Sequence, residues 1–85
     1  MDDHGPVVDP SLPGYVWRQV ADWIARRIES GELRPGARLE GERELAEQVG
    51  VAVGTVRRAV EDLRERGLVV TFPGKGTYVK ERGGG

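Results

Sequence analysis

The residues best suited to chemistry in this sequence are arginines and small residues near its middle. Gly54, Thr55, Arg57 and Arg58 fall within five consecutive positions, and Arg43 comes eleven positions before Gly54. A guanidinium can donate two parallel hydrogen bonds to a phosphate or to a guanine edge. A helix that begins near Gly54 would also offer free backbone amides to an anion. The pattern favours binding of an anionic partner such as nucleic acid.

Residue types that catalyse reactions or bind metals are sparse. The single histidine, His4, lies near the N-terminus, and the chain contains no cysteine. No two carboxylates share an apolar setting that would raise a pKa. Gly74-Lys75-Gly76 lacks the other residues of a phosphate-binding loop and the helix that follows one. We therefore expect no enzyme activity, no cofactor and no metal site.

Length and composition indicate one small globular domain. The chain has 85 residues, 32% of them charged, and a net charge of −1. No apolar run approaches the roughly 20 residues of a membrane span, and the N-terminus has no signal-peptide pattern. We expect a cytoplasmic protein with no membrane partner.

The charge is spread unevenly along the chain. Residues 1–14 have a net charge of −3 and contain three prolines, whereas residues 66–82 have a net charge of +3. This pattern predicts a disordered acidic arm over 1–14, a domain over 15–80 and a flexible tail over 81–85.

An apolar stripe predicts the first helix over 16–30. The residues expected on its inner face recur every four positions: Val16, Val20, Ile24 and Ile28. Trp17 lies beside this stripe and is expected in the core. Trp23 lies at the other margin, where we expect partial packing under the arm or the hairpin, with a partner contact as the alternative.

Two shorter helices are expected at 42–49 and 53–66, with the spacing of a helix-turn-helix. Ala46 is small where the two helices would cross, and Gly50 follows at a tight turn that requires positive φ. Val56 then fills the core between the helices. The charged residues of 61–66 are expected to form a solvated face.

The last third of the domain predicts a β-hairpin. Residues 68–72 are rich in β-branched types, 73–76 are turn residues with Lys75 at the tip, and 77–79 form the returning strand. Leu39 is expected to be a short, buried, extended residue. The expected fold class is α+β, a winged helix-turn-helix with three helices packed on a small antiparallel hairpin wing.

Four stretches in this order resemble the N-terminal winged helix-turn-helix DNA-binding domain of the GntR family of bacterial transcription regulators: ESGELRPGARL, ERELAEQVGV, GTVRRAVEDLRERGLV and GKGTYV. In that family the segment binds operator DNA as part of a dimer. The resemblance implies that Arg43, Thr55 and Arg57 contact phosphates and bases. It places Gly74 and its neighbours at a wing tip near the minor groove. It implies a cytoplasmic, nucleoid-associated repressor whose partners are duplex DNA and a second copy of the chain.

The sequence departs from the family pattern at the starts of both helices. Leu39-Glu40-Gly41 stands where the family usually has Leu-Pro-Ser, so the helix loses a capping hydroxyl and Glu40 adds negative charge near the expected phosphate path. Ala52-Val53 stands where the family usually has Ser-Arg or Thr-Arg. We expect weaker DNA binding, with Val53 available to pack on a thymine methyl group.

Several alternatives remain open from the sequence. Arg43 has Glu40 and Glu47 as candidate ion-pair partners, in place of DNA. The near-neutral charge and the loss of an arginine at Val53 also suit a winged-helix module for protein contact, with Trp23 binding the partner. Family members usually carry a C-terminal effector domain. We expect a stand-alone regulator, or else a domain of a longer protein, and no small-molecule effector pocket in either case.

Overall fold

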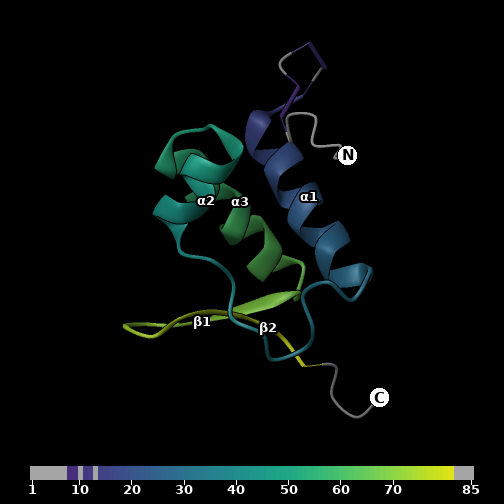
Figure 1. Ribbon diagram of the computed structural model, residues 1–85, viewed down its shortest axis with the longest axis vertical. Coiled ribbons are helices and arrows are strands. Elements are labelled where there is room, and N and C mark those ends of the chain that lie inside the picture. Colours follow the sequence, from purple (N-terminus) through teal and green to yellow (C-terminus); the bar gives the residue numbers. More distant parts are fainter. Residues whose placement is uncertain (1–7, 10, 13, 82–85) are drawn as a thin grey trace.

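The computed structural model describes residues 8–9, 11–12 and 14–81. Within this part of the chain, three helices precede a two-stranded antiparallel hairpin (Figure 1). The elements are α1 (Val16–Glu29), α2 (Glu42–Val49), α3 (Val53–Glu65), β1 (Val69–Phe72) and β2 (Gly76–Val79). The predicted winged helix-turn-helix architecture is confirmed. Four boundaries differ by one residue: α1 ends before 30, α3 ends before 66, β1 begins after 68, and Gly76 belongs to β2 and not to the turn.

Helix α1 packs on α3 through a buried stripe that is shorter along the helix than the sequence predicts. Its buried residues are Val20, Ala21, Ile24 and Ala25. Val16 is 37% exposed, so its expected place on the inner face is wrong, and Ile28 is only half-buried. A four-residue repeat drifts by about 40° per step around a helix of 3.6 residues per turn, so the ends of the stripe rotate out of the core.

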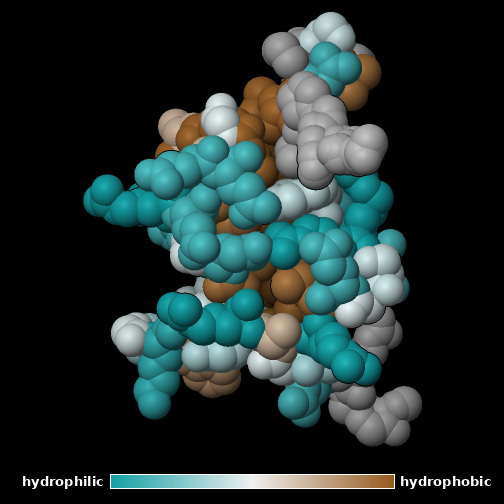
Figure 2. All heavy atoms as spheres, viewed as in Figure 1, coloured by the Kyte–Doolittle hydropathy of each residue, from teal (hydrophilic) through white to brown (hydrophobic). Residues whose placement is uncertain are grey.

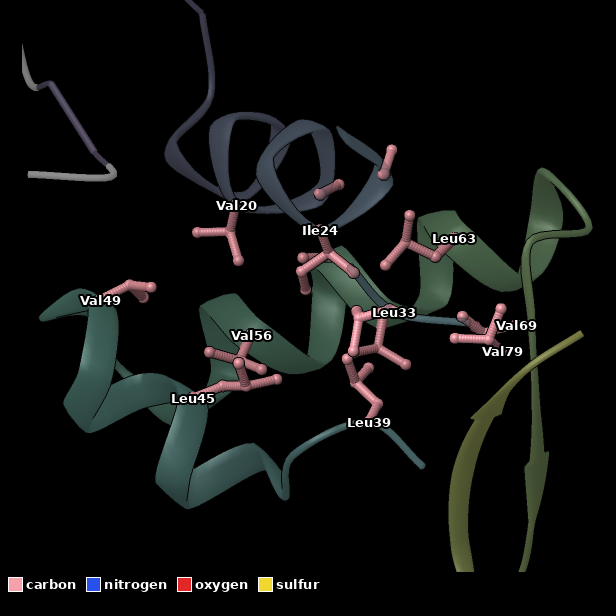
Figure 3. Packing of buried hydrophobic residues seen from close by; sticks show 14 of the residues in the cluster. Val20, Ile24, Leu33, Leu39, Leu45, Val49, Val56, Leu63, Val69 and Val79 are labelled. Atoms are coloured by element: carbon pink, nitrogen blue, oxygen red, sulfur yellow. The ribbon is translucent and has the colours of Figure 1, made fainter. Parts of the chain in front are cut away.

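Helices α2 and α3 form the helix-turn-helix. Gly50 ends α2 in the left-handed conformation, with φ of 75°, and its amide donates to the carbonyl oxygen of Ala46 at 2.9 Å. Only glycine adopts this conformation without strain, so the turn stays short. Figure 3 shows Leu45 of α2 and Val56 of α3 meeting beneath Val20 and Ile24 of α1. All four are fully buried, as the helix-turn-helix spacing predicts for Val56.

The hairpin is the wing, and a segment before α2 extends its sheet. Val69 pairs with Val79 and Phe72 with Gly76, and both valines point into the core (Figure 3). Arg38 forms an isolated antiparallel bridge with Tyr78 beside β2. Leu39, which follows it, is 2% exposed, so its expected buried, extended position is confirmed.

Two described residues of the predicted arm lie against the folded domain. Val8 packs on the core, and the Asp9 amide donates to Gln19 Oε1 at 2.7 Å. Residues 1–7, 10, 13 and 82–85 lie outside the described residues, so the disordered arm and flexible tail stay predictions. Among the helices that the structure describes, none is both long enough and apolar enough to cross a membrane.

Candidate nucleic-acid interface

The N-terminal turn of α3 is exposed and uncapped. Ala52 is the N-cap residue, with extended backbone (φ −71°, ψ 152°) and no side-chain hydrogen bond to the helix. Among the described residues, no acceptor is found for the amides of Val53 and Gly54. Free amides at a helix start, together with the positive end of the helix dipole, favour an anion there.

The three residues predicted to project from this helix are accessible. Gly54 and Arg57 are exposed and Thr55 is half-buried. A Cβ placed on Gly54 would meet no atom within 4 Å, so the backbone at this position is open to a large partner. A large ligand can therefore approach the α3 backbone closely at Gly54.

Arg57 is held beside the start of α2. Its Nε and Nη2 both donate to Glu42 Oε1 at 3.2 Å, and the two side chains are 66% and 41% exposed. The ion pair joins the N-terminal ends of α2 and α3. An exposed pair of this kind contributes little to stability, so the guanidinium is readily available to a competing anion.

Arg43, on the first turn of α2, is exposed. The acids that the sequence offered as its partners, Glu40 and Glu47, form no ion pair with it in the described structure. The Arg43 side chain is therefore exposed to solvent in the first turn of α2, next to Glu42 in sequence.

Arg58 differs from the other predicted contact residues because it points back toward α1. Its guanidinium lies 4.0 Å from the ring centroid of Trp17 and pairs with Glu61 at 3.6 Å. Trp17 is half-buried and not fully in the core, and the ring of Tyr15 stacks on it with the two centroids 5.9 Å apart. The contact between Arg58 and Trp17 ties α3 to α1.

Glu40 is paired inward, which corrects the expectation that it adds unbalanced negative charge near a phosphate path. Arg27 Nη2 and Nη1 donate to its two carboxylate oxygens at 2.8 and 3.2 Å. Partial burial raises the pKa of Glu40, but the hydrogen bonds and charge of Arg27 outweigh it and hold the pKa below its ordinary value. The Arg27 guanidinium also lies over the indole ring of Trp23, 4.7 Å from the ring centroid.

The charged end of α3 is exposed at Glu61, Arg64, Glu65 and Arg66, as the sequence predicts, and two of its arginines also reach neighbouring elements. Arg66 donates a hydrogen bond to Asp22 of α1 at 2.7 Å and forms an ion pair with Asp62 at 2.8 Å. Arg64 donates to the Thr71 hydroxyl of β1 at 3.0 Å. The contacts with Asp22 and Thr71 join α3 to α1 and to the wing, and periodicity alone does not reveal them because these partners lie outside the helix.

The wing tip carries the remaining predicted residues. Gly74 has φ of +79° in the turn, and the Lys75 amide donates to the Phe72 carbonyl oxygen at 2.8 Å. Both residues are exposed. Arg38, which the sequence reasoning missed, donates through Nε to the Lys75 carbonyl oxygen at 3.3 Å. The signal in the sequence was its place directly before Leu39, which is predicted to be buried and extended.

A groove separates the wing from the start of α2. It has a volume of about 350 Å³ and is lined by residues 38–42 and 71–77 together with Val60. Figure 2 shows a notch on this side of the molecule with hydrophilic residues along its edges. Arg38 and Lys75 lie on its wing side, and Glu42 lies on its helix side.

Comparison with known proteins decides the family. The sequence profile described as bacterial regulatory proteins, gntR family, matches residues 17–79. The chain belongs to the GntR family. The HTH-type transcriptional regulator SmoD of Agrobacterium fabrum is 40% identical over 70 residues, which cover 82% of this chain and 29% of SmoD. The mannosyl-D-glycerate transport/metabolism system repressor MngR of Escherichia coli is 44% identical over 66 residues, covering 78% of this chain and 28% of MngR.

Solved GntR structures share the fold. YtrA from Sulfolobus acidocaldarius, a GntR-family transcription factor, matches with a TM-score of 0.82 and 35% identity over 88% of this chain and 79% of that one. The DNA-binding domain of AraR, crystallised with operator ORR3, matches with a TM-score of 0.72 and 32% identity over 91% and 99%. The chain spans less than a third of the length of the two curated relatives above.

Proposed function

We propose that this chain is a sequence-specific DNA-binding transcription regulator that acts as a repressor. The observation that carries the proposal is the exposed start of α3. Gly54, Thr55 and Arg57 lie there, on a fold shared with a domain crystallised on its operator. In the proposed complex α3 enters the major groove and the wing tip, residues 73–76, lies at the flanking minor groove.

Each interface residue has a role that its position allows. Arg57 and Arg43 bind phosphate oxygens or a guanine edge, and Thr55 donates a hydroxyl to a phosphate or base. Gly54 lets the duplex approach the helix backbone closely. Lys75, beside Gly74 at the wing tip, neutralises a backbone phosphate. Arg58, stacked on Trp17, supports the helix from behind.

In the proposed function the protein represses by occupying a promoter, which requires no catalytic step. One recognition helix reads one half-site, so a second copy of the chain on the adjacent half-site would supply the rest of the affinity. We place the protein in the cytoplasm, where its DNA target lies.

Affinity measurements on a selected operator test the proposal. Arg57→Ala and Arg43→Ala should each weaken binding by about 1–3 kcal/mol, measured by fluorescence anisotropy. Arg26→Ala is the matched control, because this arginine is exposed on α1 and forms no ion pair among the described residues. Unchanged affinity in both interface variants would contradict their assignment.

The competing function, a module for protein contact, loses its main support. Trp23, the residue offered for partner binding, packs on the core with Arg27 over its ring. An NMR titration with duplex DNA at low salt separates the two functions. Chemical-shift changes concentrated at 53–58 and 73–76 support DNA binding, and their absence favours the protein-contact module.

A further inference from the structure

We propose that Arg38 is an additional DNA-binding residue, which with Lys75 forms a clamp for one backbone phosphate at the wing. The inference rests on the proposed DNA-binding function and adds a residue outside both the helix-turn-helix and the hairpin. Its ligand is a phosphodiester oxygen of duplex DNA flanking the bases that α3 contacts.

The backbone of Arg38 is fixed as part of the wing. Arg38 bridges to Tyr78, and the next residue, Leu39, donates its amide to the Thr77 carbonyl oxygen at 2.8 Å. On the other side, the Val79 amide donates to the Ala37 carbonyl oxygen at 2.8 Å. Arg38 therefore moves with the hairpin, although it precedes the hairpin by some thirty residues in the chain.

The side chain of Arg38 lies along the wing tip. Its Nε donates to the Lys75 carbonyl oxygen at 3.3 Å, and a Cβ added to Gly76 would come within 2.7 Å of that same nitrogen. Glycine at 76 thus leaves room for the guanidinium. This contact places the Arg38 guanidinium beside the backbone of Lys75, whose side chain carries a second positive charge.

The guanidinium keeps most of its hydrogen-bonding capacity. Of its five N–H donors, only the one on Nε has an acceptor among the described residues. No carboxylate in the described part of the chain forms an ion pair with Arg38, and the residue is exposed. The two terminal nitrogens can therefore bind an anion while Nε continues to hold the wing tip.

The charge around the groove favours an anion at this position. Its two acidic groups, Glu40 and Glu42, are each paired with an arginine, Arg27 and Arg57 respectively. Arg38 and Lys75 are then the groove's positive charges without an ion-pair partner in the described structure. Although the whole chain has a net charge of −1, the wing side of the groove presents two cations.

Salt-dependent binding of the full chain to duplex DNA tests the clamp. Arg38→Ala should weaken binding to a selected operator and to a random duplex by the same factor, about tenfold. It should also reduce the slope of log affinity against log salt by about one. Arg38→Lys should keep the slope, because lysine retains the charge. Arg26→Ala serves as the control for loss of a surface arginine, and thermal melting checks that each variant is folded.

The possible results separate this inference from the proposed function. If Arg38→Ala binds with wild-type affinity and slope while Arg57→Ala is weakened, the clamp is overturned and DNA binding stands. If the wild-type chain binds neither duplex, the proposed function fails and the clamp with it. A last NMR titration uses inorganic phosphate in place of DNA, at matched ionic strength. NMR shifts at Arg38 with duplex but not with phosphate support a DNA contact, and equal shifts with both overturn it.

Discussion

The guanidinium of Arg58 lies 4.0 Å from the centroid of the Trp17 indole ring, and this contact joins the candidate recognition helix to α1. Tyr15 stacks on the same indole at an interplanar angle of 16°. The first turns of α3 therefore contact α1 through aromatic residues as well as through the buried core. Arg58 acts from behind the interface, whereas Arg57, its neighbour in sequence, faces the start of α2.

A double-mutant cycle measures this contact. Arg58→Ala and Trp17→Ala should show a favourable coupling of about 0.5–1 kcal/mol in the free energy of unfolding, because the cation–π interaction is partly shielded from water. Urea denaturation of the two single variants and the double variant gives the value. Arg18, which lies 5.3 Å from the same ring, serves as a second, weaker partner for comparison. Strictly additive effects of Arg58 and Trp17 would contradict the interpretation.

The missing caps of α2 and α3 give a paired prediction. Ala52→Ser should raise the free energy of unfolding by about 1 kcal/mol, because serine supplies the hydroxyl that the uncapped amides of α3 lack. Gly41→Ser, at the N-cap of α2, should gain only a few tenths of a kcal/mol, since glycine is already a tolerable cap. Chemical denaturation of both variants checks the order. Equal gains would show that cap chemistry does not limit these helices.

The fold was predictable because its signals are local. Gly50 and Gly67 mark helix ends, β-branched residues mark the first strand of the hairpin, and each signal spans only a few positions. The two α1 residues that are less buried than predicted were also placed by a local pattern. Val16 and Ile28 fit a four-residue repeat, but an α-helix turns a little further than that repeat, so the buried stripe shifts onto Ala21 and Ala25.

The site was predictable only in part, because long charged side chains choose partners by tertiary placement. Spacing located the start of α3 and the exposed positions there. It gave no sign that Arg57 meets Glu42, fifteen positions away, or that Arg38 meets Lys75, thirty-seven positions away. A guanidinium reaches several candidate acids, and the folded backbone decides between them.

The inward ion pair of Glu40 predicts a specific loss of stability in acid. Burial raises the pKa of this carboxyl and Arg27 lowers it, with a net value below the ordinary 4.5. The stabilisation is therefore fully present above the unfolded pKa and disappears as the pH falls through the lower, folded pKa. Glu40→Gln should cost about 1–2 kcal/mol of the free energy of unfolding at pH 7, and this cost should shrink as the pH falls through the folded pKa of Glu40.

The control for this measurement is Glu47→Gln, since Glu47 is exposed and forms no ion pair within the described residues. Urea denaturation at several pH values between 3 and 7 should give nearly parallel curves for the wild type and the control. The Glu40→Gln curve should instead converge on the wild type in acid. A constant difference across this range would mean that the pair does not titrate with folding.

Gly54 should show opposite effects on stability and on DNA binding. It lies in the first turns of α3 with ordinary backbone geometry and with nothing within 4 Å of an added Cβ, so Gly54→Ala introduces no clash in the free protein. Alanine should raise the free energy of unfolding by about 0.5–1 kcal/mol, because it loses less backbone entropy in a helix. The same methyl group would stand where the proposed duplex approaches, so operator affinity should fall about tenfold. Urea denaturation and fluorescence anisotropy on one preparation report both quantities. A variant that merely damaged the fold would lower both, and an affinity that stayed constant would remove Gly54 from the interface.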